Sequence, residues 1–335
     1  MDKRLEALRK WVDTVLDGCR YRLRPASADA SFRRYFRVFA GADIYIAMDA
    51  PPDTQDCAAY VRIAKRFRQL GLNVPQVLHS DTNQGFLLIS DLGDRSYLSC
   101  LSEATVENLY ADAFQALLIL QRNGVPDSDF LPGYDEGLLL SELRIFQEWY
   151  LGRHLGLRLT TTQEATLDRV FTRLKDSALE QPRVWVHRDF HSRNLMMTEE
   201  NNPGILDFQD AVSGPVTYDL VSLLRDCYIS WPYERVERWV HNYYTLAHDA
   251  GVPVGEDEDQ FRQWFERMGV QRHLKATGIF ARLKYRDRKP AYIIDIPRTL
   301  RYVRDASSRC GDLQLLHELL WDVGVWRTLD EAEDR

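Results

Sequence analysis

The spacing of hydrophobic residues changes near residue 92. Before it, short apolar stretches alternate with turn residues, a pattern typical of β-strands. Beyond it, apolar residues recur mostly every three or four positions, which indicates α-helices. The pattern therefore predicts an α+β protein with two lobes: a small β-rich lobe over residues 1–92 and a larger, mainly α-helical lobe over residues 93–335.

The small lobe is expected to contain one sheet and two helices. Strands are expected at Tyr21–Leu23, Phe32–Phe39, Ile44–Met48, Val74–Leu78 and Phe86–Ser90. Leu5, Leu8 and Val12 share one face of an N-terminal amphipathic helix. A second helix is expected over Ala58–Leu70, with Asp53 or Thr54 capping its start and Gly71 ending it.

The large lobe has a helical pattern with one interruption. Helices are expected at Val106–Gln121, Leu138–Leu155, Thr162–Leu179, Tyr218–Tyr228, Arg235–Ala250, Asp257–Ala281 and Ile296–Tyr302. The interruption runs from Val184 to Asp207. It contains two short apolar strands, Leu195–Met197 and Ile205–Leu206, on either side of a polar turn that includes Pro203-Gly204.

Composition and charge narrow the class of protein. Hydrophobic residues make up 45% and charged residues 28% of the chain, as in ordinary globular proteins. The net charge of −7 argues against nucleic acid as a partner, and no apolar run reaches about 18 residues, so a membrane span is not expected. The five cysteines form no C-x-x-C pair, which is typical of free thiols in the cytoplasm. We expect a cytoplasmic protein with a small-molecule partner; the sequence leaves the oligomeric state open.

The most informative segment runs from His187 to Asn194 and reads H-R-D-x-x-x-x-N, with Asp207-Phe208 downstream. This spacing is typical of kinase catalytic loops. Asp189 follows an apolar strand and is the candidate base that accepts the proton of an attacking hydroxyl. The oxygens of Asn194 and Asp207 are the candidate Mg²⁺ ligands.

Other interpretations of these residues were weighed. His, Asp and Asn are common in loops, and Asp207 could simply cap a turn. The spacing His187-x-Asp189-x-His191 also suggests a metallohydrolase, but the other six histidines form no second cluster that could complete such a site. We interpret His187 as a residue that braces the loop. Asp219, at the start of a helix, is interpreted in the same way.

Together with these motifs, nearly the whole chain resembles the aminoglycoside phosphotransferase family, whose members share the protein-kinase-like fold. Four strings resemble more specifically the anomeric N-acetylmuramate/N-acetylglucosamine kinases of bacterial cell-wall recycling. They are Ala30–Val38, Met48–Pro52, Ile205–Ala211 and Asp295–Arg298. The resemblance implies an ATP- and Mg²⁺-dependent kinase that phosphorylates the anomeric hydroxyl of an amino sugar in peptidoglycan recycling. It also implies that adenine binds at a hinge formed by Ser90, Asp91 and Leu92.

Two departures from the family pattern concern the phosphate-binding side. Met48 stands where the family usually has a phosphate-binding lysine, and the helix that follows offers no glutamate partner near its start. The turn that ends at Ser31 lacks the glycines of a phosphate-binding loop, although its small residues could let backbone N–H groups approach a phosphate. Arg33 and Arg34 are the nearest cations and are the candidates to replace the lysine; one of them could instead only pack its stem on the sheet.

The acceptor side has weaker signals. If the acceptor carries a lactyl carboxylate, a basic residue should meet it, and Arg282, Tyr285 and Arg286 are candidates. A solvated helix face is the alternative interpretation of that run. Two other functions stay open: a kinase for another hydroxylated metabolite or an aminoglycoside, and a nucleotide-binding pseudokinase that acts as an interaction module. A protein kinase is disfavoured because the chain has no A-P-E segment.

Overall fold

The computed structural model describes residues 2–27, 33–124 and 130–333. The chain forms two compact units. The first, Met1–Ile119 with Arg193–Asp210, is called the sheet unit here. The second, Leu120–Ser192 with Ala211–Arg335, is called the helical unit. These units divide the chain at other points than residue 92, and the lobe boundary expected there stays a prediction.

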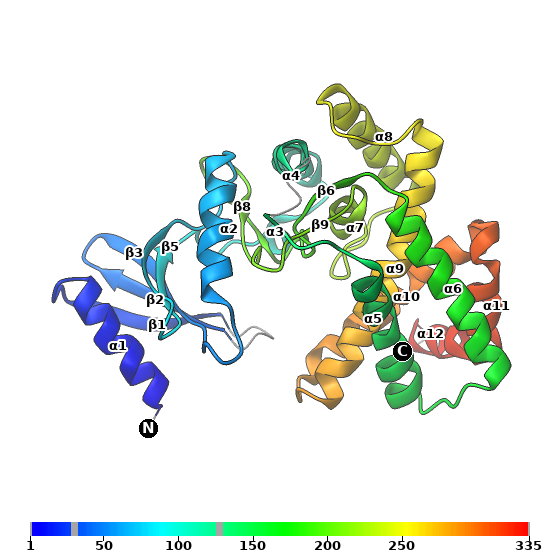
Figure 1. The fold of residues 1–335 in the computed structure, drawn as a ribbon, viewed down its shortest axis with the longest axis horizontal. Helices are drawn as coiled ribbons and strands as arrows, with labels where there is room; N and C mark the ends of the chain where they lie inside the picture. Colours follow the sequence, from blue (N-terminus) through cyan, green and yellow to red (C-terminus); the bar gives the residue numbers. More distant parts are fainter. Residues whose placement is uncertain (1, 28–32, 125–129, 334–335) are drawn as a thin grey trace. The chain divides into compact units, whose positions relative to one another are not determined.

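The sheet unit is built on a five-stranded antiparallel sheet with the order β1-β2-β3-β5-β4. Its strands are β1 (Tyr21–Ser27), β2 (Arg34–Ala40), β3 (Asp43–Asp49), β4 (Val77–Asp81) and β5 (Phe86–Ser90). Helix α1 (Lys3–Val15) covers one face of the sheet and α2 (Cys57–Gln69) the other, as Figure 1 shows. The α1 face is sealed by a core that includes Leu8, Val12 and Val38, all fully buried.

Two sequence-based boundaries in this unit were wrong. The N-cap of α2 is Asp56, whose side chain accepts a hydrogen bond from the Ala59 N–H at 2.9 Å. The expected caps, Asp53 and Thr54, lie in the preceding turn. Strand β4 starts at Val77 rather than Val74. One reason is that Pro75 has no N–H to contribute to a strand ladder.

The expected end of α2 is confirmed at Gly71. This glycine has φ +91°, the left-handed conformation that commonly ends helices. The next N–H, of Leu72, returns to the carbonyl of Phe67 at 3.0 Å. The helix therefore ends at Gln69, with Leu70 as its C-cap.

A late segment of the chain belongs to the sheet unit. The short strands β7 (Leu195–Met196) and β8 (Gly204–Ile205) form an antiparallel hairpin, and Asn73 bridges to Gly204. Phe208 follows and is fully buried, with its ring 4.8 Å from that of Tyr60 and 5.9 Å from that of Phe67 on α2. This packing fixes the hairpin against α2. Helices α3 (Tyr97–Cys100) and α4 (Val106–Asn123) complete the unit, which α4 leaves at Ile119.

The helical unit surrounds one long helix, α9 (Glu258–Tyr285), of which most side chains are buried. Around it are α5 (Glu136–Ile145), η1 (Phe146–His154), α6 (Thr161–Leu179), α7 (Tyr218–Leu224), α8 (Tyr233–Asp249), η2 (Pro290–Asp295), α10 (Ile296–Arg309), η3 (Gly311–Leu313), α11 (Gln314–Asp322) and α12 (Val325–Glu333) (Figure 1). A two-stranded antiparallel sheet pairs β6 (Arg183–Val186) with β9 (Val212–Pro215).

Several predicted helices in this unit have other limits. The segment Leu138–Leu155 changes from α-helix to π-helix after Ile145, where a Cβ on Gly278 would lie only 2.7 Å from the Ile145 carbonyl oxygen. The predicted helix Tyr218–Tyr228 stops at Leu224, before a short loop. Helix α10 continues past the predicted end to Arg309, and α11, α12 and β9 were not predicted. The five cysteines are free thiols, as expected.

Candidate active site

The open end of the β7–β8 hairpin places the two predicted metal ligands next to each other. The Leu206 N–H donates to the Asn194 carbonyl at 2.9 Å, so Asn194 and Asp207 flank the last backbone bond of the hairpin. Asp207 has φ +62°, a conformation that Asp tolerates better than most residues but that still costs roughly 1 kcal/mol. Such strain is common at functional positions.

Arg33 is the cation that meets Asp207. Its Nη1 lies 3.3 Å from Asp207 Oδ1. The Arg33 side chain is only 10% exposed, whereas that of Asp207 is 39% exposed. Gln209 Nε2 donates to the same oxygen at 2.9 Å. Asp207 is therefore an accessible carboxylate whose charge is offset by an arginine from the start of β2.

A cavity of about 290 Å³ opens beside these residues. All of its lining belongs to the sheet unit. Ile46, Ile89 and Leu206 supply apolar walls, and Asn194 with Asp207 supplies a polar end. A cavity with apolar walls and a few polar groups at one end suits a ligand that combines a flat apolar ring with charged groups.

The predicted hinge residues Ser90, Asp91 and Leu92 also line this cavity. The Asp91 carboxylate is already engaged, because it accepts hydrogen bonds from Arg37 and from the Gly93 N–H at 2.9 Å. The hydrogen bond to Asp91 raises the pKa of Arg37 further. Asp91 therefore stiffens this segment through its side chain, and only its backbone is available to a ligand.

The remaining phosphate-side candidates lie elsewhere. Arg34 bonds Asp49 and Asp2. Because successive residues of a strand point to opposite faces, Arg34 lies on the face of the sheet that α1 covers, and the structure does not bring it to the cavity. Met48 pairs with Tyr35 in the register of the sheet. Its side chain is fully buried, which suits an apolar residue at a position where the family usually has a lysine. Ser31 lies outside the described residues.

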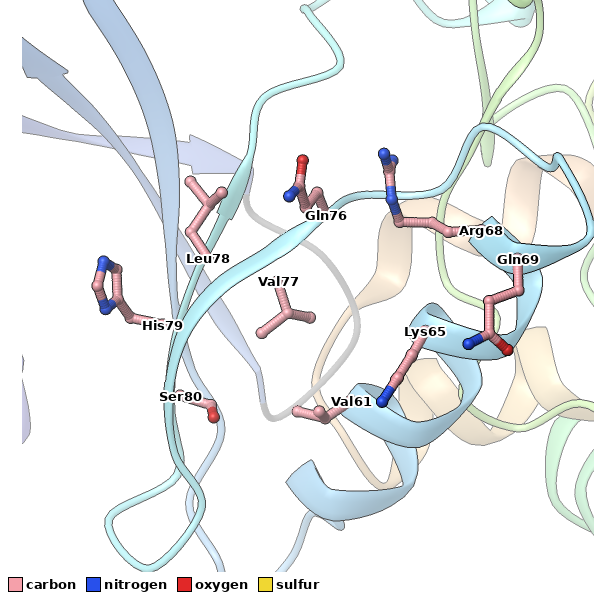
Figure 2. A pocket seen from close by; sticks show the side chains of 9 residues that line it. All are labelled: Val61, Lys65, Arg68, Gln69, Gln76, Val77, Leu78, His79 and Ser80. Carbon is pink, nitrogen blue, oxygen red and sulfur yellow. The ribbon is translucent and has the colours of Figure 1, made fainter.

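A second hollow of about 510 Å³ lies between α2 and the edge strand β4. Figure 2 shows Val77 directed toward Val61 on α2, with Lys65 beside them and His79 pointing away from the helix. The residues that line it include no carboxylate. We therefore place the chemistry in the first cavity.

In the helical unit, the loop that carries Asp189 is fixed through the backbone N–H groups of His187 and Arg188. The Asp219 carboxylate accepts the N–H of His187 at 2.6 Å and that of Arg188 at 3.0 Å. The Asp189 N–H in turn donates to His187 Nδ1 at 3.2 Å. Arg188 adopts φ +76°, an unusual conformation for a residue other than glycine, which these bonds hold in place. The structure thus brings His187 and Asp219 together around the candidate base.

The electrostatic surroundings keep Asp189 ionised. Enclosure by protein alone would raise the pKa of Asp189. The nearby basic side chains, chiefly Lys275 and then His191 and Arg272, outweigh this effect, so the pKa is lowered below its ordinary value. The side chain stays partly accessible. Asp189 is therefore a charged acceptor of hydrogen bonds at neutral pH.

A buried ionic network supports this environment. Glu142, only 4% exposed, accepts from Lys275 Nζ at 2.7 Å, and it also bonds Arg188 and Tyr134. Burial would raise the pKa of Glu142, but Lys275 and Arg188 outweigh it and the pKa is lowered. Lys275 also donates to the Tyr218 hydroxyl at 3.0 Å. Two of the cations around Asp189, Lys275 and Arg188, are thus anchored by a carboxylate that does not belong to the motif.

Aromatic rings continue from the loop toward η2. The ring of His191 meets Tyr228 edge-on at 5.4 Å, Tyr228 lies 6.3 Å from Phe280, and Phe280 stacks on Tyr292 at 6.0 Å. The Asp226 carboxylate fixes the start of this row, because it accepts the N–H groups of Ser192 at 2.8 Å and of Tyr228 at 2.9 Å. Such a surface suits a ring-shaped acceptor.

The Asp295–Arg298 string has a structural role beside this row. Arg298 Nη1 donates to the Cys227 carbonyl at 2.9 Å and to Asp295 Oδ1 at 3.1 Å. The string thereby ties α10 to the loop that follows α7.

The predicted acceptor residues at the end of α9 do not reach the base. Arg286 pairs with the adjacent Asp287 at 2.8 Å, and the Tyr285 hydroxyl lies 3.1 Å from His154 Nδ1. Arg282 is about 15 Å along the helix axis from Arg272, given a rise of about 1.5 Å per residue. The structure instead brings Arg272 and Lys275 to Asp189. Their signal in the sequence was two cations within the stretch 268–281, whose other positions are largely apolar.

The metallohydrolase interpretation has no support. Within the described ranges, no group of three or more His, Cys, Asp or Glu side chains is arranged to hold a metal ion. Asn194 and Asp207 still fit Mg²⁺, which uses one or two protein oxygens and takes the rest of its ligands from water and phosphates. No described helix has the length and apolarity needed to cross a membrane.

A sheet unit with a cavity beside Asn194 and Asp207, and a helical unit that carries an ionised Asp189 in the motif loop, are features of a protein-kinase-like phosphotransferase. Residues 22–264 match the model of the phosphotransferase enzyme family, and the chain belongs to that family. The predicted resemblance and class of enzyme are confirmed.

Curated relatives match nearly the full length. The chain is 44% identical over 333 residues to an N-acetylmuramate/N-acetylglucosamine kinase of Pseudomonas putida, covering 96% of this chain and 97% of the relative. It is 46% identical over 324 residues to a protein of the same name from Neisseria meningitidis serogroup B, covering 94% and 95%.

Solved structures confirm the two-lobed fold. A choline kinase from Streptococcus pneumoniae superposes with a TM-score of 0.62 at 12% identity, covering 90% of this chain and 98% of that one. An ADP-bound aminoglycoside phosphotransferase, APH(2'')-Ib, gives a TM-score of 0.59 at 18% identity, with the same coverage. At these identities the likeness concerns the fold alone.

Proposed function

We propose that this protein is an ATP-dependent kinase that transfers a phosphoryl group to the anomeric hydroxyl of N-acetylmuramate and N-acetylglucosamine. The observation that carries the proposal is the environment of Asp189, a partly accessible carboxylate held ionised by Lys275, His191 and Arg272. A kinase needs such an acceptor for the hydroxyl proton. The choice of amino sugars is supported by the 44–46% identity, nearly end to end, with kinases named for them.

Each candidate residue has a role in this proposal. The apolar walls of the cavity enclose adenine, which bonds backbone groups of the segment 90–92. Asn194 and Asp207 hold Mg²⁺, which when bound neutralises phosphate charge. Arg33 takes the place of the missing lysine by exchanging its contact with Asp207 for one with a phosphate. Asp189 orients and deprotonates the attacking hydroxyl.

The acceptor is held in the helical unit. The aromatic row from His191 to Tyr292 packs against the sugar ring, and Asp226 keeps that row in place through its backbone bonds. A product phosphorylated at the anomeric position serves cell-wall recycling, and the enzyme is expected in the cytoplasm.

The test is a sugar panel followed by identification of the product. ATP consumption is measured with N-acetylmuramate, N-acetylglucosamine, other hexoses, choline and an aminoglycoside. We expect turnover with the two amino sugars and a ³¹P signal that couples to the C1 proton. Coupling to another ring proton would refute anomeric transfer, and preferred turnover of choline or an aminoglycoside would assign a different metabolite kinase. No turnover with any acceptor, together with ATP binding, would indicate a pseudokinase.

A further inference from the structure

Arg272 is a buried cation without an ion pair. It lies on α9 and is 5% exposed. Its one hydrogen bond joins Nη1 to the Cys227 sulfur at 3.8 Å, and its Nε has no partner. Over the described residues, no carboxylate oxygen lies within 4.0 Å of its guanidinium. A guanidinium has five N–H donors, so most of its bonding capacity is unused.

Other cations of the helical unit show that this is exceptional. Arg225, 3% exposed, bonds Glu266 with Nη1 at 2.9 Å and lies over the Phe265 ring. Lys275 bonds Glu142 at 2.7 Å, and Arg188 bonds the same carboxylate. Burying a charge without such a partner is costly, and native proteins pair nearly all buried charges. An unpaired one therefore calls for a ligand that supplies the missing charge.

The surroundings of Arg272 place it in the acceptor region. The anionic groups that act on it electrostatically include Asp189 and Asp226, the candidate base and the residue that fixes Tyr228. Its sulfur contact, Cys227, is the residue whose carbonyl is held by Arg298. Lys275 has a stronger electrostatic effect on Asp189 than Arg272 has. The need to keep the base ionised therefore does not by itself explain why Arg272 is there.

We propose that Arg272 binds an oxyanion of the reacting substrates through its planar N–H fork. Two groups have this chemistry: the carboxylate of an acceptor such as N-acetylmuramate, and the phosphoryl group during transfer. This inference rests on the proposed function and adds a residue that distinguishes acceptors or stabilises the transferred group. Arginine suits both groups because its donors match two oxygens at once.

The experiment compares three variants of the full-length protein. Arg272→Met removes the charge and keeps most of the volume, and Arg272→Lys keeps the charge without the fork. Arg225→Met is the matched control, because it removes a buried cation that does have a partner and leaves Glu266 with only Arg309, 4.0 Å away. For each we measure the melting temperature without ligand, and kcat and KM with N-acetylmuramate and with N-acetylglucosamine at a temperature where all variants are folded.

We expect Arg272→Met to melt at or above the wild-type temperature, because an unpaired buried charge is removed, while losing about 10- to 100-fold in kcat/KM. A loss confined to N-acetylmuramate assigns the carboxylate; a loss of kcat with both sugars assigns the phosphoryl group. Arg225→Met should melt lower and keep its kinetic constants. Unchanged constants in Arg272→Met, or full activity in Arg272→Lys, would overturn the proposal.

Failure of the proposed function would look different. In that case the wild type turns over neither amino sugar, and Arg272 is tested by binding alone. Inorganic phosphate should then raise the melting temperature of the wild type more than that of Arg272→Met. Equal shifts in the two proteins would overturn the inference about Arg272 independently of the sugar.

Discussion

Asp189 and Asp207 come from one motif but occupy opposite kinds of surroundings. In the helical unit, Asp189 is enclosed among basic side chains, and Asp219 fixes the backbone of its loop. In the sheet unit, Asp207 is 39% exposed and meets one arginine at 3.3 Å. A proton acceptor benefits from permanent, rigid ionisation, whereas a metal ligand has to exchange partners when the ion and nucleotide arrive. The difference therefore separates a fixed group from an exchangeable one.

The strongest test of the fixed side is Asp189→Asn. The amide keeps the shape but cannot accept the hydroxyl proton, so kcat should fall by about 10³-fold or more with little change in melting temperature. Steady-state kinetics and thermal melting measure both quantities. Asp168→Asn, which removes one carboxylate from an exposed pair with Arg144 at 2.8 Å, is the control and should keep wild-type rates. Near-normal turnover in Asp189→Asn would remove Asp189 as the base.

The exchangeable side is tested by Asp207→Asn. Loss of a carboxylate ligand should weaken Mg²⁺ binding, so we expect a rate reduced by about 10²-fold that recovers in part at high Mg²⁺. Initial rates over a Mg²⁺ titration measure this dependence. Asp53→Asn, in an exposed turn, is the control. If the Mg²⁺ dependence of Asp207→Asn matched that of the wild type, Asp207 would not be a metal ligand.

A smaller effect should distinguish the two arginines that the sequence offered. Arg33→Met should raise KM for ATP about 10-fold, and Arg33→Lys should raise it less, because a lysine keeps the charge. Arg34→Met should leave KM for ATP unchanged, since Arg34 faces α1, and should instead lower the melting temperature by leaving Asp49 with Arg4 alone. If Arg34→Met raised KM for ATP and Arg33→Met only lowered the melting temperature, the proposed role of Arg33 would be contradicted.

The smallest effect on rate is expected from Asp219, where pH dependence is informative. Burial raises the pKa of Asp219 from 3.8 to about 7. A raised carboxyl pKa favours the folded state fully below the ordinary pKa, and this contribution is lost as pH rises through 7. The free energy of unfolding of the wild type should therefore approach that of Asp219→Asn between about pH 4 and pH 7. Urea unfolding at several pH values measures it, and a constant difference would contradict the assignment.

The sequence predicted the motif residues because their spacing is fixed by chemistry that repeats across a family. It located the strands and most helices because alternation and helical periods follow burial. It missed the N-cap Asp56 because several polar residues precede α2 and only the actual turn decides among them. It missed Arg272 because periodicity shows that a helix is buried, not whether a cation within it has a partner.

The sequence named Arg282 and Arg286 as candidates to meet an acceptor carboxylate, and that role stays a prediction. Lys275, which does act on Asp189, lies on the same helix, but Arg282 is about two turns further along and Arg286 is the residue that caps the helix end. A run of basic residues in a sequence is easy to see, whereas the position along a helix that faces a loop depends on how the helix packs. Contacts between segments that are distant in the sequence determine which helix positions lie near Asp189, and residue spacing alone does not reveal those contacts.

The insertion of Phe208 between Tyr60 and Phe67 has a consequence for how this protein can be divided. A fragment ending at residue 92 or 119 would lack the segment Arg193–Asp210 and would expose the side of α2 that this ring covers. The sheet unit therefore cannot be expressed as one contiguous piece. Recombination between relatives would have to exchange two separate stretches of the gene to inherit it intact.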